Sequence, residues 1–179
     1  MARVTQDPHG VSATPVAASQ PRGAPLAARR FLLGGGVQGL GVRPAIYRLA
    51  TRLELNGSVR NTSRGVEIEI EGPRDRVRQF ERSLPNSLPA GASLTMIDSE
   101  RLAPQGLRAF TIVKEPRHGP LTAPVPADRG LCSNCALEIA SSNDRRHKYS
   151  FTSCTQCGPR YTVICAMPFE RADTTMAGF

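Results

Sequence analysis

The sequence predicts an α+β fold, in which a ferredoxin-like βαββαβ domain over residues 29–115 is followed by a small four-cysteine domain over residues 131–179. Two observations support this class. Apolar residues in the first segment recur with strand and helix periodicities in the order strand, helix, strand, strand, helix, strand, which is the split βαβ arrangement. The second segment carries two Cys-x-x-Cys pairs, which are typical of a metal-organised module.

The first predicted strand covers residues 30–37 and ends in consecutive glycines. A helix is predicted over residues 44–55 because apolar residues recur there at three- and four-residue spacing. Four of them are expected to face inward: Ile46, Leu49, Ala50 and Leu53. The dipeptide Asn56-Gly57 is expected to end this helix.

A β-hairpin is predicted next, with strands over residues 58–62 and 66–71 joined by a turn at 63–65. The second of these strands alternates strictly between apolar and acidic residues, which indicates one buried and one solvent-facing side. The solvent-facing side is expected to carry Glu67, Glu69 and Glu71.

A second helix is predicted over residues 73–84, and one or two final strands over 93–99 and 108–114. The inward side of this helix carries Val77, Phe80 and Leu84. Its arginines indicate a solvated helix face rather than a stripe that binds nucleic acid. The elements together predict two helices on one face of an antiparallel sheet.

Two segments show no regular periodicity. Residues 1–28 are rich in Ala, Pro, Ser and Gly and are predicted to be a disordered arm. Residues 116–130 are predicted to be a linker because they contain several prolines and glycines.

Bulk properties narrow the functional classes. Of the 179 residues, 40% are hydrophobic and only 5% are aromatic, so the core should be modest and aliphatic. No apolar run is long enough for a membrane span, and the first residues lack the apolar region of a secretory signal. Cysteines paired as metal ligands suit a reducing compartment, so the cytoplasm is expected. The net charge of +8 fits a small anionic substrate and a nucleic acid equally well.

A glycine-punctuated stretch, residues 35–43, lies between the first strand and the first helix. Pro44 suits the first helical position, where a missing N–H costs nothing. Such a turn can direct successive backbone N–H groups into one concavity at the positive end of a helix, and Arg43 can add a guanidinium at its rim. Glycine spacing alone fits a plain tight turn before an amphipathic helix equally well.

Four cysteines have the spacing of a zinc site: Cys132, Cys135, Cys154 and Cys157. The eighteen residues between the two pairs lie in the range that brings both onto one tetrahedral Zn²⁺. Four thiolates leave no open coordination position, so the zinc should be structural. A redox dithiol and an iron–sulfur cluster are the alternatives.

Other residues of this segment receive provisional roles. The basic run from Arg145 to Lys148 is expected to offset the negative charge of the thiolates. Within that run, His147 is expected to lie at the surface rather than to bind metal. Cys165 follows two apolar residues and is expected to be a buried thiol.

The glycine stretch resembles the acylphosphatase signature Gly-x-Val-Gln-Gly-Val-x-Phe-Arg, which it matches from Gly35 to Arg43 except at Leu40 and Val42. The form followed by proline resembles the amino-terminal domain of the HypF family of hydrogenase-maturation carbamoyltransferases. The second segment is similar to the first zinc-finger module of that family, in the words at 154–161, 167–169 and 174–179.

The resemblance implies a ferredoxin-like fold, a structural zinc and hydrolysis of an acyl phosphate, carbamoyl phosphate by family analogy. Arg43 would hold the phosphate together with the loop, and Asn61 would position the attacking water. The phosphate-binding positions so implied are Gln38, Gly39, Leu40, Gly41, Val42 and Arg43. Separate hydrogenase-maturation proteins are the implied partners.

The resemblance stops where the family's second zinc module would begin, so the chain is expected to be C-terminally truncated and not a complete carbamoyltransferase. Two alternatives stay open: an inactive or interaction fragment, and a zinc-ribbon module that binds nucleic acid. The second is disfavoured because the expected solvent-facing side of the sheet is acidic and lacks the aromatic residues that stack on bases.

Overall fold

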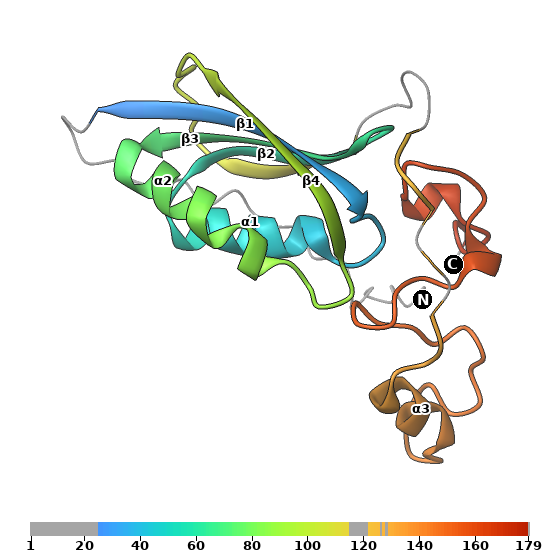
Figure 1. Cartoon of the computed structure of the whole chain (residues 1–179). Helices are drawn as coiled ribbons and strands as arrows, with labels where there is room; N and C mark the ends of the chain where they lie inside the picture. Colours follow the sequence, from blue (N-terminus) through green and yellow to red (C-terminus); the bar gives the residue numbers. More distant parts are fainter. Residues whose placement is uncertain (1–24, 115–121, 126, 128, 179) are drawn as a thin grey trace, which may run out of the picture.

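The computed structural model describes residues 25–114, 122–125, 127 and 129–178. Figure 1 shows a twisted sheet with two helices against one face, followed by a smaller part at one end of the sheet. We call residues 26–113 the sheet domain and residues 129–178 the cysteine module. The sheet domain consists of β1 (Leu26–Gly36), α1 (Val42–Arg52), β2 (Asn56–Thr62), β3 (Gly65–Pro73), α2 (Arg74–Ser83), β4 (Ser93–Leu102) and β5 (Phe110–Val113).

The sheet has five strands in the order β4-β1-β3-β2-β5. The first four pair antiparallel, as the ferredoxin-like pattern predicts. The fifth strand, β5, pairs parallel with β2, so the sheet is mixed and the prediction of an antiparallel sheet was wrong in this respect. The chain leaves β4, crosses the ends of the inner strands and then runs along the free edge of β2 in the same direction as β2.

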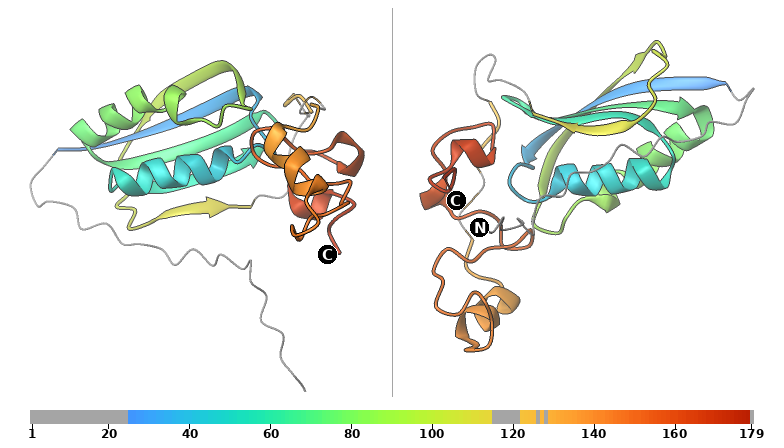
Figure 2. Two further views of the ribbon diagram at one scale, coloured as in Figure 1. Left: turned by 90° about the horizontal axis from the view of Figure 1, so that it is seen from below. Right: turned by 180° about the vertical axis from the view of Figure 1, so that it is seen from behind.

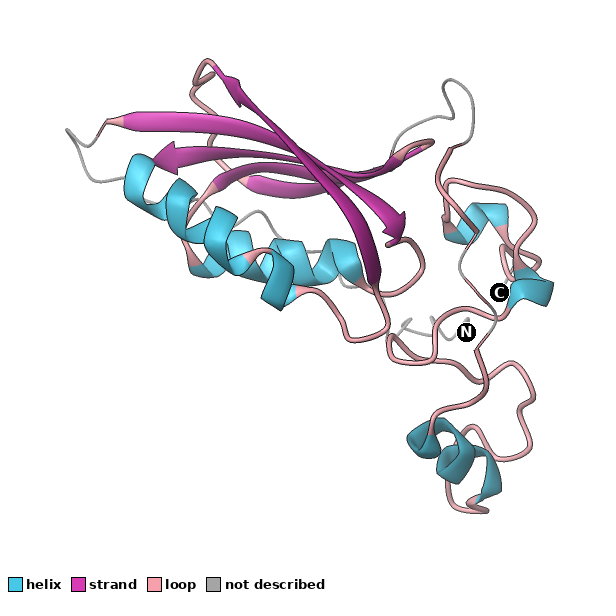
Figure 3. Cartoon of the chain, viewed as in Figure 1, coloured by secondary structure: helices cyan, strands magenta, loops and turns pink. Residues whose placement is uncertain are grey.

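Figure 3 shows the two helices lying against one face of the sheet, and the buried apolar residues that form the core come from these helices and the strands. The inward residues predicted for both helices are buried, except that Leu53 is only half-buried. Phe31 of β1 and Phe80 of α2 pack with ring centroids 5.8 Å apart. Burial of this apolar layer is the main stabilising contribution to the domain.

Several element boundaries differ from the prediction. The first strand begins at Leu26, inside the segment expected to be disordered, because Ala28 is buried and pairs with both neighbouring strands. Residues 1–24 of that segment lie outside the described residues. The first helix begins at Val42, which makes Pro44 its third residue, where a backbone N–H is still not needed.

The dipeptide Asn56-Gly57 was predicted to end the first helix, but it belongs to β2. The helix ends earlier, and the chain turns through Glu54, which has a φ of 49°. The Asn56 side chain is buried and donates a hydrogen bond to the carbonyl oxygen of Leu107 at 2.7 Å. This bond holds the segment that leads into β5.

The acidic side of β3 is not the bare solvent-facing surface that the alternation suggests. Glu71 is buried and accepts hydrogen bonds from the backbone N–H groups of Gln105 and Gly106, so its expected exposure was wrong. Glu67 pairs with Arg60, and Glu69 pairs with Arg30 at 2.8 Å. The carboxylates therefore contribute little net negative charge to this face.

The cysteine module contains one α-helix, α3 (Ser133–Ala140), and two short 3-10 helices, Tyr161–Val163 and Arg171–Asp173. Both views of Figure 2 place this module at the end of the sheet domain where β1 leads into α1. Of the expected linker, Thr122 and Ala123 donate backbone hydrogen bonds to the carbonyl oxygen of Ser63, each at 2.8 Å. No helix among the described residues is long and apolar enough to cross a membrane.

Candidate functional site

Residues 35–43 are called the glycine loop; they comprise the last two residues of β1, the connection to α1 and the first two residues of α1. Gly39 and Gly41 have φ angles of 74° and 76°, a region that side-chain-bearing residues rarely adopt. In the described part of the chain, no hydrogen-bond acceptor is found for the six backbone N–H groups from Gln38 to Arg43. Alternating backbone conformations at the start of a helix make such N–H groups a concave site for an anion.

Gln38 fixes the position of the glycine loop. Its side chain is buried, and its Nε2 donates to the carbonyl oxygens of Thr62 at 2.8 Å and Gly65 at 2.9 Å. These two residues flank the turn between β2 and β3. Its Oε1 accepts a hydrogen bond from the backbone N–H of Phe169 at 2.7 Å. The side chain of Gln38 is thus fully used within the protein, whereas its backbone N–H is one of the six without an acceptor among the described residues.

Arg43 and Asn61, which are distant in sequence, converge on one oxygen atom. Asn61 Nδ2 donates to the carbonyl oxygen of Phe169 at 2.8 Å, and Arg43 Nη2 lies 3.4 Å from the same oxygen. Arg43 Nη1 pairs with the carboxylate of Glu170. The two predicted residues therefore share one small volume, reached from the start of α1 and from the end of β2.

No motif in the sequence predicts a role for Phe169 and Glu170 at this site. Residues 167–169 carry only part of the resemblance to the HypF zinc-finger module. We call residues 167–170 the cap segment, because it covers Arg43 and Asn61. The side chains of Arg43 and Glu170 are only 18% and 15% exposed, so this ion pair is largely shielded from solvent. Residue spacing within the sheet domain cannot predict that a residue of the cysteine module pairs with Arg43.

The cysteine module also packs directly onto the glycine loop. A Cβ atom added at Gly41 would lie 2.5 Å from Thr155 Cγ2, and one added at Gly39 would lie 2.8 Å from Pro159 Cγ. Leu40 is buried, and its Cδ2 would lie 2.9 Å from a Cβ added at Gly158. The loop is therefore an interface between the two parts as well as a turn.

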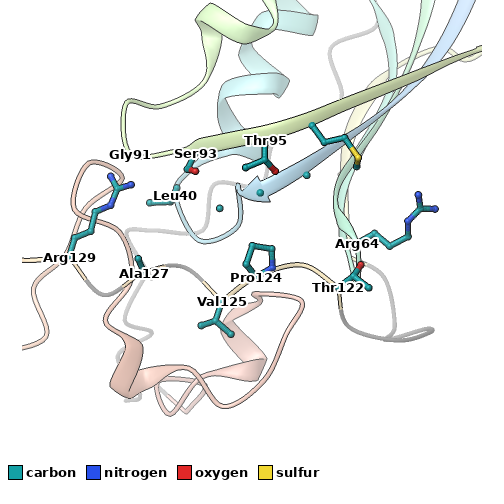
Figure 4. Close-up of a pocket in the computed structure, with 14 residues that line it drawn as sticks. Leu40, Arg64, Gly91, Ser93, Thr95, Thr122, Pro124, Val125, Ala127 and Arg129 are labelled. Carbon is teal, nitrogen blue, oxygen red and sulfur yellow. The ribbon is translucent and has the colours of Figure 1, made fainter.

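A cavity of about 500 Å³ borders the glycine loop, and Figure 4 shows the residues that line it. Its walls include Leu40, the glycines at the end of β1 and Pro124 and Val125 of the connecting segment. Arg43 and Asn61 are not among the residues that line it. The cavity is thus distinct from the volume on which those two side chains converge.

The four predicted cysteine ligands come together in the cysteine module. Their Sγ atoms all lie within 4.8 Å of one another. Neighbouring sulfurs are 3.6 Å apart for Cys132 and Cys154, and 3.8 Å apart for Cys154 and Cys157 and for Cys157 and Cys135. Tetrahedral Zn²⁺ with Zn–S bonds of about 2.3 Å requires sulfurs separated by about 3.8 Å. The set therefore fits a structural zinc.

The surroundings of these cysteines favour the thiolate form at Cys157. Burial alone raises the pKa of its thiol, but hydrogen bonds from the backbone of Cys154 and Cys132 and from neighbouring thiols lower the pKa to about 6. Arg160 Nη2 also donates to Cys157 Sγ at 3.1 Å. Burial raises the pKa of the Cys135 thiol, whose proton a metal would displace on binding.

The expected roles in this module have different outcomes. Arg146 of the expected basic run pairs with Glu138 at 2.5 Å. That hydrogen bond, and further the charges of Glu138, Asp144 and Cys135, raise the pKa of Arg146, so one residue of the run does lie near the thiolates. Arg160, from outside the run, contacts a cysteine sulfur directly. His147 is not among the clustered ligands, but it is half-buried rather than at the surface, and its Nδ1 has no partner in the described residues. Cys165 is exposed, so the prediction of a buried thiol was wrong; its backbone N–H, not its sulfur, is held, by the carbonyl of Asp173.

The fold and this site define a class of protein: a ferredoxin-like domain with a glycine-rich loop at a helix start, joined to a four-cysteine zinc module. The family model described as acylphosphatase matches residues 29–112, and the model described as HypF finger matches residues 131–164. The acylphosphatase of Pseudomonas aeruginosa is 41% identical over 81 residues, which are 45% of this chain and 88% of that protein. The chain belongs to the acylphosphatase family and carries in addition a HypF-type zinc finger.

HypF proteins are among the relatives that match both parts of the chain. Carbamoyltransferase HypF of Synechocystis sp. is 39% identical over 145 residues, or 81% of this chain. A crystal structure of full-length HypF in a phosphate- and nucleotide-bound form matches 89% of the chain, with a TM-score of 0.77 and 34% identity. The structure of T. kodakarensis HypF matches 86% of it with a TM-score of 0.67. The chain spans about a fifth of these relatives: 19% of the Synechocystis protein, and 21% and 19% of the two crystallised chains.

Proposed function

We propose that this chain hydrolyses an acyl phosphate, with carbamoyl phosphate as the natural substrate, within hydrogenase maturation. The observation that carries the proposal is the convergence of Arg43 and Asn61 on one oxygen atom. Arg43 is also the last of six consecutive residues whose backbone N–H groups have no acceptor among the described residues. Permanent positive charge and N–H donors at one point suit a phosphoryl group.

In this proposal the backbone N–H groups of residues 38–43 and the Arg43 guanidinium bind the phosphoryl oxygens. The Asn61 amide orients a water molecule toward the phosphorus. As the new phosphorus–oxygen bond forms, the bond from phosphorus to the acyl oxygen breaks, and that oxygen leaves as a carboxylate, carbamate in the case of carbamoyl phosphate. An acyl phosphate is already activated, so positioning and charge stabilisation suffice.

The zinc has no part in this reaction step. When bound, it holds the cysteine module together, and its four thiolate ligands leave it no open position for substrate. Carbamoyl transfer, the activity in the name of the HypF relatives, is proposed only for this chain completed by the further domains of that family. Other proteins of hydrogenase maturation are the proposed partners. Reduced cysteines suited to zinc support a cytoplasmic location.

The test is phosphate release by the purified, zinc-loaded chain with carbamoyl phosphate and acetyl phosphate. We expect Arg43→Ala to abolish turnover and phosphate binding. We expect Asn61→Ala to lower kcat about 100-fold or more while KM changes little, because the lost contact acts on the attacking water. Arg48→Ala, on the exposed side of the same helix, should behave as the unaltered chain.

Absence of hydrolysis by a folded, zinc-loaded chain would overturn the proposal. An equal loss of kcat and of substrate affinity in Asn61→Ala would contradict the water-positioning role.

A further inference from the structure

We propose that Glu170 is a further residue of the acyl phosphate site, contributed by the cysteine module, and that it acts as an internal competing anion on Arg43. The inference rests on the proposed function, because it assumes that Arg43 binds the phosphoryl group. In this proposal the cap segment lowers the apparent affinity of the site for its substrate.

The cap segment offers the site the same kinds of group that an acyl phosphate offers. Glu170 places a carboxylate on Arg43, and Phe169 places a carbonyl oxygen against both Arg43 and Asn61. An acyl phosphate likewise carries one carbonyl oxygen and an anionic head. Each proposed substrate-binding side chain therefore already has an acceptor from the cap segment.

Hydrogen bonds and burial fix the position of the cap segment. The Phe169 N–H donates to Gln38, and Met167 and Pro168 are buried. Behind it, the carbonyl oxygen of Glu170 accepts a hydrogen bond from the backbone N–H of Asp173 at 2.9 Å. The contact with Arg43 is thus built into the fold of the cysteine module.

A phosphoryl group and the Glu170 carboxylate compete for the same guanidinium. The apparent affinity for phosphate then equals the intrinsic affinity multiplied by the fraction of molecules in which Arg43 is vacant. A phosphoryl dianion gains the unpaired N–H groups of residues 38–43 as well as Arg43, which favours displacement of Glu170. Removing the Glu170 charge should therefore tighten phosphate binding without touching the reacting atoms.

The test measures the binding of inorganic phosphate to the zinc-loaded chain by isothermal titration calorimetry. For Glu170→Gln we expect binding to tighten about five- to tenfold, the range for removing one partly shielded ion pair. In steady-state assays KM for carbamoyl and acetyl phosphate should fall by the same factor with kcat unchanged. Glu170→Asp, which keeps the charge, should retain most of the competition.

Glu138→Gln is the matched control. Glu138 also pairs with an arginine in the cysteine module and is 32% exposed, but its partner is Arg146, away from the glycine loop. Phosphate affinity should be unchanged in this variant. Zinc content and melting temperature confirm that each variant is folded.

Unchanged, weaker or undetectable phosphate binding in folded Glu170→Gln would overturn the inference. A selective loss of carbamoyl phosphate over acetyl phosphate would also overturn it, because Glu170 would then accept a hydrogen bond from the carbamoyl amino group. Tighter phosphate binding without any hydrolysis would support the inference and refute the proposed function. Hydrolysis by the chain, with phosphate affinity unchanged in Glu170→Gln, would support the proposed function and refute the inference.

Discussion

Gly41 shows at the scale of one residue how the glycine loop serves two purposes. Its φ of 76° turns the backbone into the start of α1, and its missing side chain leaves room for Thr155 of the cysteine module. Backbone conformation and close packing both demand glycine at this position. The glycine of the signature motif therefore suits the packing of the cysteine module on the loop as well as the proposed binding of an anion.

Gly41→Ala should destabilise the chain by about 2–4 kcal/mol, combining left-handed backbone strain with the clash against Thr155. Gly106→Ala is the matched control, because Gly106 also has a φ of 76° but has no atom within 4 Å of an added Cβ. Urea unfolding of both variants separates strain from contact.

The double variant Gly41→Ala with Thr155→Ser should recover part of the difference, since serine lacks the Cγ2 atom that clashes. Equal destabilisation by Gly41→Ala and Gly106→Ala would contradict the contact.

Arg43 and the four cysteines could be predicted from the sequence because their motifs are local or strictly spaced, whereas Asn61 was implied only by the resemblance to acylphosphatases. Glu170 could not be predicted, because its pair with Arg43 forms only when the two parts of the chain fold against each other. Arg160 could not for a different reason: it lies outside the basic run of residues 145–148, and its contact with Cys157 depends on the fold of the cysteine module. Glu71 was misjudged for a related reason: alternation along a strand predicts which side a residue faces but not which loop covers that side.

At the scale of elements, β5 depends on how the chain returns from β4. The buried Glu71 carboxylate binds two successive N–H groups of this return, and Asn56 binds the carbonyl of Leu107. The chain thereby reaches the free edge of β2 and adds a parallel strand. Helices and the hairpin were predictable from short-range periodicity, whereas the direction of β5 depends on these long-range polar contacts.

Glu71→Gln should destabilise the sheet domain by about 1–3 kcal/mol, because a buried amide group cannot accept both hydrogen bonds as a carboxylate does. Glu69→Gln on the same strand should cost less than about 1 kcal/mol, since its pair with Arg30 is partly exposed. Denaturant unfolding gives both values.

Hydrogen exchange should show faster exchange in residues 110–113 of Glu71→Gln than in the Glu69→Gln control. Unchanged protection of β5 would mean that Glu71 does not hold the return segment.

At the scale of the whole molecule, the cysteine module covers the proposed active site of the sheet domain. The sheet domain has its own apolar core, whereas the module depends on four clustered sulfurs. Sequence spacing predicted both parts but not their contact, because nothing in either pattern encodes the surface of the other. Metal content and phosphate binding should consequently be linked.

Removal of zinc by a strong chelator should unfold the cysteine module and leave the sheet domain folded. With the cap segment released, phosphate should bind more tightly than to the zinc-loaded chain, in the same direction as Glu170→Gln. Calorimetry with phosphate, circular dichroism and a colorimetric zinc assay follow the three quantities.

Cys165→Ser is the control for this experiment and should leave zinc content and phosphate affinity unchanged, because Cys165 lies outside the ligand cluster.

Loss of phosphate binding on zinc removal, with the sheet domain intact, would contradict the prediction and show that the cysteine module supports the glycine loop.

The amide of Gln38 joins three separate stretches of chain: the strand-to-helix turn that contains it, the hairpin tip and Phe169. Rotating that amide by half a turn would set its oxygen against two carbonyls and its NH₂ group against another N–H. All three bonds would be lost together, so only one rotamer is compatible with the assembled molecule. One neutral side chain therefore links the sheet domain to the cysteine module, so a displacement of one part strains the hydrogen bonds to the other.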